Sequence, residues 1–193
     1  MRLIMLGPPG AGKGTQAKRL AVDLDVPAIS TGDIFRTNIR ERTELGRLVQ
    51  SILEEGGLVP DEVTNDMVRD RVGQPDCGDG FILDGYPRTL AQVDALDGML
   101  KGIDTQLDHV IELTVDVDEV VRRLHQRAVE EGRDDDTPPV IRRRQEVYQQ
   151  DTAPLVDVYT QRGLLVKVDG MGAVDEVTAR IEAALGTGRS LRR

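Results

Sequence analysis

The sequence is poor in cysteine and has no long apolar run. Its 193 residues include one cysteine, Cys77, so neither an internal disulfide nor a thiolate-rich metal site is expected. The apolar run at residues 3–6 is too short for the core of a signal peptide, and no stretch approaches the length of a membrane span. We therefore expect a cytoplasmic protein without a membrane partner.

Positive charge is also in deficit. The formal net charge is −9, which argues against a nucleic acid as the main partner. A small polyanion can still bind where basic residues gather at one site, so the positions of the arginines matter more than their number. The hydrophobic fraction of 39% and the length are those of an ordinary globular chain with one main domain.

Short apolar runs alternate with segments of helical periodicity. Most of the runs are apolar throughout, which indicates a sheet covered on both faces and hence parallel strands with helical crossovers. The alternation predicts a three-layer α/β domain. The predicted strands are 2–6, 27–29, 80–84, 109–114 and 164–168, and the predicted helices are 13–23, 33–42, 44–54, 62–72, 90–100, 117–130, 139–161 and 174–184.

The stretch GPPGAGK at residues 7–13 follows the first predicted strand and fits the P-loop pattern G-x-x-x-x-G-K. Glycines allow successive backbone N–H groups to surround a phosphate, and the next helix adds its positive end. Lys13 adds a charge for the β- and γ-phosphates. Gly14 stands where Ser or Thr is usual and Thr15 comes one later, which weakens the case for a hydroxyl ligand to the metal. The motif predicts a nucleoside triphosphate site.

The stretch FILDGYPRTLAQ at residues 81–92 begins as an apolar strand that ends in Asp84. In P-loop proteins a carboxylate at such a position holds Mg²⁺ directly or through water. Arg88 and Gln92 are four residues apart at the start of a predicted helix and share one face. Arginine suits a phosphate, and the donor and acceptor of glutamine suit a base edge. This stretch indicates the site of a phosphate acceptor.

Three further motifs are STGDIFR at residues 30–36, GGLVPDE at residues 56–62 and a late Arg/Asp cluster. Together with GPPGAGKGT and FILDGYPRTLAQ they resemble the motifs of the adenylate kinase family, in its short-flap bacterial form, over residues 2–184. The resemblance implies a P-loop nucleoside monophosphate kinase fold, with a five-stranded parallel sheet of order 2-3-1-4-5 and helices on both faces. It implies reversible phosphoryl transfer from MgATP to AMP giving two ADP, by a monomer that uses Mg²⁺ and no zinc.

The resemblance also divides the single kinase domain, residues 1–193, into parts. An AMP-binding subdomain is expected at 30–59 and a short flap at 126–136. Residues 186–193 are expected to form a frayed tail. The remaining core comprises 1–29, 60–125 and 137–185.

Site residues follow from the same resemblance. The catalytic set would be Lys13, Asp84, Arg88, Arg123, Arg127, Arg133 and Arg144. ATP would contact Gly10, Ala11, Gly12, Lys13, Gly14, Thr15, Arg127 and Gly172. No residue is expected to bind metal directly, and Asp84 would hold Mg²⁺ through water. AMP would contact Thr31, Arg36, Gly57, Leu58, Val59, Gly85, Tyr86, Pro87, Arg88, Gln92, Arg133 and Arg144.

Two other functions stay open. One is a kinase for another nucleoside monophosphate, against which Thr31 and Gln92 argue. The other is a P-loop nucleotide-binding switch without transfer, which would need no second cluster of arginines.

Within the run Arg142–Arg144 successive side chains point about 100° apart on a helix, so only Arg144 is expected to face the nucleotide site. Asp135 and Asp136 would either orient the arginines or cap the helix that follows.

Overall fold

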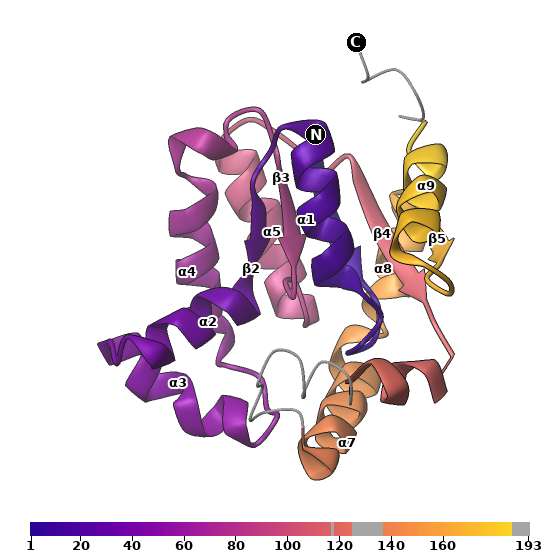
Figure 1. Cartoon of the computed structure of the whole chain (residues 1–193). Helices are drawn as coiled ribbons and strands as arrows, with labels where there is room; N and C mark the ends of the chain where they lie inside the picture. Colours follow the sequence, from indigo (N-terminus) through magenta and orange to yellow (C-terminus); the bar gives the residue numbers. More distant parts are fainter. Residues whose placement is uncertain (117, 125–136, 187–193) are drawn as a thin grey trace.

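The computed structural model describes all residues except 117, 125–136 and 187–193. The described strands form one parallel sheet of five strands in the order β2-β3-β1-β4-β5 (Figure 1). This order confirms the topology that the resemblance implies. The strands are β1 (Arg2–Leu6), β2 (Ala28–Ser30), β3 (Phe81–Asp84), β4 (His109–Thr114) and β5 (Leu165–Asp169).

Side chains of the central strand β1 alternate between two cores. Leu3 and Met5 pack with α1 (Lys13–Leu24) and α9 (Val174–Ala184) on one face of the sheet. Ile4 and Leu6 belong to the other core, which contains residues of α4, α5 and α8. Because both faces are covered, almost every position of β1 is buried, as its unbroken apolar run predicts. These three helices are α4 (Asp61–Val72), α5 (Leu90–Gly102) and α8 (Leu155–Gln161).

Leu83 of β3 lies in the second core and is 0% exposed. Replacing it by alanine should lower the free energy of unfolding by about 3 kcal/mol, since the lost contacts leave a cavity in a closely packed layer. Leu48→Ala is the matched control, because Leu48 of α3 (Glu44–Glu54) is 58% exposed. Denaturant unfolding of both variants measures the difference. A loss below about 1 kcal/mol for Leu83→Ala would contradict this packing.

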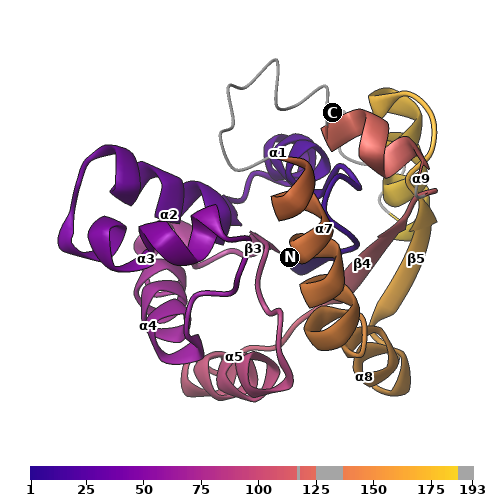
Figure 2. The same ribbon diagram turned by 90° about the horizontal axis from the view of Figure 1, so that it is seen from below.

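Between β2 and β3 the chain leaves the sheet and returns through α2 (Thr31–Arg40), α3 (Glu44–Glu54) and α4. Helices α2 and α3 project beyond the edge of the sheet beside β2 (Figures 1 and 2). They have a small core of their own, in which Phe35 and Val49 pack with Val59. Ile34 of α2 also packs against the second main core, and Met67 of α4 packs against both that core and the small one. This part of the molecule therefore has a core of its own and still contacts the core of the sheet.

The prediction of one helix over residues 139–161 is wrong. The structure has α7 (Pro138–Val147), a π-helical turn (Tyr148–Thr152) and then α8. Pro154 explains the break, because proline has no N–H to donate and its ring clashes with the carbonyl four residues before it. The chain widens ahead of Pro154, and the N–H of Ala153 donates to the oxygen of Tyr148 at 2.8 Å, five residues back.

Smaller differences concern ends of elements. Helix α2 begins at Thr31 rather than at residue 33, and a short 3₁₀ turn at Pro75–Cys77 was not predicted. Residues 118–124 are helical, within the predicted helix 117–130. None of the described helices combines the length and the apolar character needed to cross a bilayer.

Candidate functional site

A cavity of about 590 Å³ opens where the parallel strands end. The last residues of β1, β2 and β3, namely Leu6, Ser30 and Asp84, line it, and so does Gly170 directly after β5. In open parallel sheets this edge is where loops from neighbouring strands converge and ligands bind. Residues of the sequence motifs therefore line this cavity.

One end of the cavity is formed by the glycine-rich loop before α1. Gly10 and Gly12 have positive φ values of 86° and 93°, and Gly12 is the N-cap of α1. The first turn of α1 reads Lys-Gly-Thr-Gln, so the helix has no carboxylate of its own in the turn at the positive end of its dipole. The Lys13 ammonium donates to the carbonyls of Gly7 and Pro8 at 2.8 and 2.9 Å. This geometry suits an anion at the start of α1.

Asp84 at the end of β3 lies against the start of α1. A Cβ placed on Gly14 would come within 3.1 Å of Asp84 Oδ2, so the glycine leaves room for this carboxylate where a P-loop usually has Ser or Thr. Among the described residues no three His, Cys, Asp or Glu side chains gather as metal ligands. One carboxylate beside a phosphate loop fits Mg²⁺, which keeps several waters and is held largely by the phosphates of a nucleotide.

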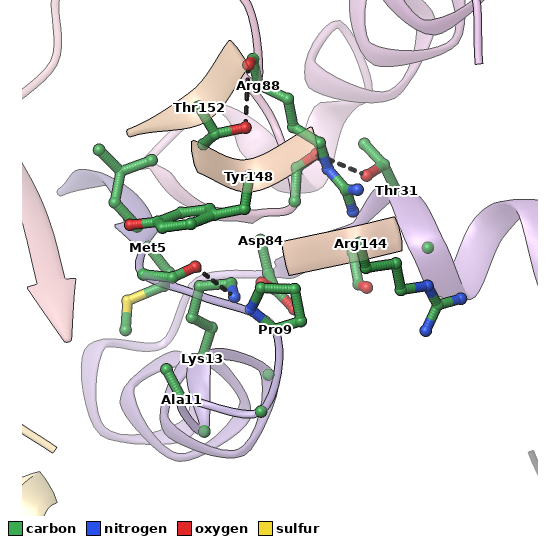
Figure 3. A pocket seen from close by; sticks show the side chains of 18 of the residues that line it. Met5, Pro9, Ala11, Lys13, Thr31, Asp84, Arg88, Arg144, Tyr148 and Thr152 are labelled. Carbon is green, nitrogen blue, oxygen red and sulfur yellow. Dashed lines mark hydrogen bonds between the residues drawn. The ribbon is translucent and has the colours of Figure 1, made fainter. Parts of the chain in front are cut away.

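The opposite end of the cavity contains three guanidiniums. Arg88 is partly buried, and its Nε donates to the Gly85 oxygen at 2.8 Å (Figure 3). Burial lowers the pKa of Arg88, and the nearby Arg144 and Arg36 lower it further, while Asp84 opposes the shift. All four charged side chains line the cavity. Cations that repel one another in this way attract a multiply charged anion.

Gly85 allows two of the predicted site residues to converge. Its φ is +81°, and a Cβ there would lie 2.8 Å from Thr31 Oγ1 and 3.0 Å from Arg88 Nη2. The first contact is closer than real Cβ atoms make and the second is unusually tight, and the positive φ adds strain for any other residue. The Thr31 hydroxyl donates to the Gly85 oxygen at 3.0 Å, which ties α2 to the loop after β3.

Ser30 caps α2: its Oγ accepts the N–H of Asp33 at 3.2 Å. The Asp33 carboxylate pairs with Arg36 on the same helix and with Lys18 of α1, the latter at 3.7 Å. Arg36 therefore has a carboxylate partner in this structure, and Asp33 connects α2 to the helix that follows the glycine-rich loop.

The wall between α2 and α5 is largely apolar. Phe35 and Leu53, which were not predicted as site residues, line the cavity there. So do five residues that were predicted to contact a nucleotide, namely Gly57, Leu58, Val59, Pro87 and Gln92. Tyr86 does not line it: the ring is 1% exposed, and its hydroxyl donates to Asn65 Oδ1 at 2.7 Å. Burial raises the pKa of Tyr86, so the hydroxyl stays neutral and fixes the loop from behind.

A family model described as "Adenylate kinase" matches residues 5–164. The chain belongs to the adenylate kinase family. An adenylate kinase of Clavibacter michiganensis is 58% identical over 191 residues, covering 99% of this chain and 95% of the relative. One from a Nocardioides species is 60% identical over 185 residues (96% and 97%), and one from Kocuria rhizophila is 59% identical over 184 residues (95% and 98%). The protein is accordingly a phosphotransferase of the P-loop nucleoside monophosphate kinase fold.

Two of the arginines expected in an adenylate kinase, Arg127 and Arg133, lie outside the described residues. So do Asp135 and Asp136. Four other residues expected to contact ATP line the cavity. They are Ala11 of the glycine-rich loop, Gly14 and Thr15 of α1, and Gly172.

Arg123 lies beside the glycine-rich loop of this adenylate kinase. Its guanidinium donates to the oxygens of Gly170 and Ala11 at 2.9 and 3.3 Å and to Glu119 Oε1 at 2.6 Å. Hydrogen bonds from Arg122, and then from Arg123, lower the pKa of Glu119 to about 2. Glu119 was not predicted as a site residue. Its i, i+4 spacing to Arg123 is the sequence signal that could have identified it.

Helix α7 borders the cavity, because Arg144 and Val147 line it. The Gln145 side chain donates to the Pro9 oxygen at 3.3 Å, at the glycine-rich loop. Near the other end, a Cβ on Gly56 would lie 3.3 Å from Arg144 Cγ, so the α3 side of the cavity also contacts this helix. Arg144 lines the cavity, whereas Arg142 and Arg143 are exposed.

The π-helical turn after α7 contributes two residues that were not predicted, Tyr148 and Thr152. The Thr152 hydroxyl donates to the backbone oxygen of Arg88 at 3.0 Å (Figure 3). Burial, and then the Glu112 carboxylate, raises the pKa of Tyr148 to about 12. Neither residue belongs to a recognisable motif, so only the folded chain places them at the cavity.

Proposed function

We propose that this protein catalyses the reversible transfer of the γ-phosphoryl group of MgATP to AMP, giving two ADP and so balancing the adenine nucleotides. Membership of the adenylate kinase family supports this reaction. The decisive observation is that one cavity has two cationic ends, the Lys13 loop and the Arg36, Arg88 and Arg144 cluster. A switch that holds one nucleotide needs only the first.

ATP would bind at the glycine-rich loop. The backbone of residues 10–15 and the Lys13 ammonium would surround its phosphates, with Gly172 and Arg123 beside them, and Arg127 would join from the undescribed segment. Asp84 would hold Mg²⁺ through water, and the ion would neutralise part of the phosphate charge. The uncapped start of α1 supports this placement.

AMP would bind at the guanidinium cluster. Arg36, Arg88 and Arg144 would hold its phosphate, with Arg133 as a further proposed ligand. The adenine would lie on the apolar wall. We expect it to contact Thr31, Gly57, Leu58, Val59, Gly85, Pro87 and Gln92, with Tyr86 supporting the wall from behind.

No general base is needed for this transfer. An oxygen of the AMP phosphate is already an anionic nucleophile; it bonds to the γ-phosphorus of ATP as the bond from that phosphorus to the β–γ bridging oxygen breaks. ATP, having lost its γ-phosphoryl group, leaves as ADP, and AMP, having gained it, becomes the second ADP. No proton has to be transferred. The protein contributes in-line positioning, charge neutralisation and exclusion of water, which would otherwise accept the phosphoryl group.

Water exclusion gives a reason for moving parts. We propose that residues 30–59 form an AMP-binding subdomain that closes over the acceptor and that residues 126–136 form a flap over ATP. The separate small core of α2 and α3 supports the first part of this proposal. We further propose that the enzyme works as a monomer in the cytoplasm, as its resemblance to the short-flap adenylate kinases implies.

The test is a panel of acceptors. Purified protein is incubated with MgATP and, separately, AMP, CMP, UMP, GMP, dTMP or no acceptor, and the products are quantified by ion-exchange chromatography. We expect ADP only with AMP, at two ADP per AMP consumed. Phosphorylation of another monophosphate would keep the two-ended site but change the base assignment. ADP formed without an acceptor, or no turnover, would contradict phosphoryl transfer to a nucleotide.

A further inference from the structure

Asp61, the first residue of α4, holds the side chain of Gln92 from outside the cavity. Gln92 Nε2 donates to Asp61 Oδ1 at 2.7 Å, although the two residues are 31 apart in the sequence. The second carboxylate oxygen, Oδ2, accepts the Thr89 hydroxyl at 2.9 Å. Thr89 Oγ1 in turn accepts the backbone N–H of Gln92 at 3.1 Å. Both oxygens of Asp61 are thus engaged, so the carboxylate is fixed in orientation.

The Gln92 carboxamide is fixed at both ends. While Nε2 faces the Asp61 carboxylate, Oε1 accepts the backbone N–H of Arg88 at 2.7 Å. Rotating the amide by 180° would place its NH₂ against the Arg88 N–H and its oxygen against a carboxylate oxygen, which are two repulsive contacts. The neighbours therefore determine which end is oxygen and which is nitrogen. Gln92 is 2% exposed and borders the cavity.

This orientation leaves one N–H and one oxygen lone pair of the carboxamide unused, in a fixed order. The edge of adenine, with an N6 amino donor beside an N1 acceptor, complements that order. The edge of a 6-oxopurine, with an O6 acceptor beside an N1–H donor, presents the reverse order. A base of the second kind would meet donor with donor and acceptor with acceptor.

We propose that Asp61 is a positioning residue that makes the acceptor site select 6-aminopurine over 6-oxopurine nucleotides by preventing rotation of the Gln92 amide. This inference rests on the proposed function, since it assumes that the base of the acceptor nucleotide meets Gln92. Asp61 itself touches no nucleotide. Its effect is to make the rotated amide unfavourable, and a site with fixed donors and acceptors can reject a mismatched analogue strongly.

The first experiment uses the wild-type protein with three acceptors that differ only at the purine edge. They are AMP, purine riboside 5′-monophosphate, which has hydrogen at C6, and inosine 5′-monophosphate, a 6-oxopurine. With a fixed amide, kcat/KM should fall in that order, because purine riboside loses one hydrogen bond and inosine meets two repulsions. An amide that rotates freely would serve inosine at least as well as purine riboside, and that order would overturn the proposal.

The second experiment uses Asp61→Asn. An asparagine can turn either its oxygen or its NH₂ toward Gln92, and the Thr89 hydroxyl can donate or accept, so one of the two barriers to rotation disappears. We expect the AMP to inosine monophosphate ratio of kcat/KM to fall about tenfold. The readout is the ratio, because a merely structural role of Asp61 would lower both values equally.

Asp66→Asn is the matched control. Asp66 lies on the same helix, is exposed and pairs with Arg69, so the same change of charge should leave the ratio unchanged. An unchanged ratio in Asp61→Asn would overturn the proposal, even if kcat/KM fell equally for both acceptors. If the wild-type protein transferred nothing to AMP, the proposed function itself would fail, which is a different result from transfer without selectivity.

Discussion

Lys13→Ala is expected to lower kcat about 10³-fold, because the loss of one preorganised cation at a developing charge costs about 3–4 kcal/mol of transition-state stabilisation. Lys13 begins α1 and supplies an ammonium at the glycine-rich loop, where it donates to the carbonyls of Gly7 and Pro8. Those acceptors belong to the loop itself and leave the ammonium at the edge of the cavity. A phosphate in the loop would compete with them for this charge.

The fold of Lys13→Ala should be intact, because the side chain contributes no contact to either core. Circular dichroism and thermal unfolding check this, and initial rates with MgATP and AMP check the activity. Lys101→Ala is the control, since Lys101 is exposed on α5. Activity within threefold of the wild type for Lys13→Ala would rule out a catalytic role of the loop cation.

Arg88→Ala should reduce kcat/KM for AMP by about 10²–10³-fold while ATP affinity stays close to that of the wild type. The reason lies in the cluster of Arg88, Arg36 and Arg144, in which burial and mutual repulsion already lower the pKa of Arg88. Removing this guanidinium would take away one of the three proposed donors to the AMP phosphate. The glycine-rich loop at the other end of the cavity keeps its own contacts.

Two measurements separate these effects: steady-state kinetics with varied AMP, and calorimetric binding of a non-hydrolysable ATP analogue. Arg88→Lys adds a sharper comparison, because it keeps the charge and loses the planar fork that suits a phosphate. Arg142→Ala, an exposed arginine of α7, is the control. If ATP affinity fell as much as AMP affinity, the division of the cavity into two nucleotide sites would be wrong.

The strands and the glycine-rich loop could be predicted from the sequence because their signals are local. Residues 81–83 form a continuous apolar run between a glycine and an aspartate, and a strand buried on both faces needs such a run. The loop has glycines at positions where the backbone takes positive φ. The strand order, in contrast, came from the resemblance, because nothing in a strand's own residues names its neighbour.

The sequence did not reveal contacts between distant residues. Asp61 and Gln92 belong to different motifs, and no spacing rule connects a residue at the start of α4 with one in the first turn of α5. Tyr86 lies inside a binding motif, yet its ring fills the space behind the wall, where Asn65 receives its hydroxyl. Motif membership therefore predicted the neighbourhood of a side chain but not its direction.

The π-helical turn at Tyr148–Thr152 makes the length of the chain there as important as its composition. Such a turn contains one residue more than an α-helical turn would. With that extra residue, Tyr148 and Thr152 both border the cavity while Leu155 and Tyr159 of α8 are 0% exposed in the core. Removing one residue would rotate α8 by about 100° relative to α7. A substitution between Arg144 and Leu155 should therefore disturb this part of the fold less than the deletion of a residue.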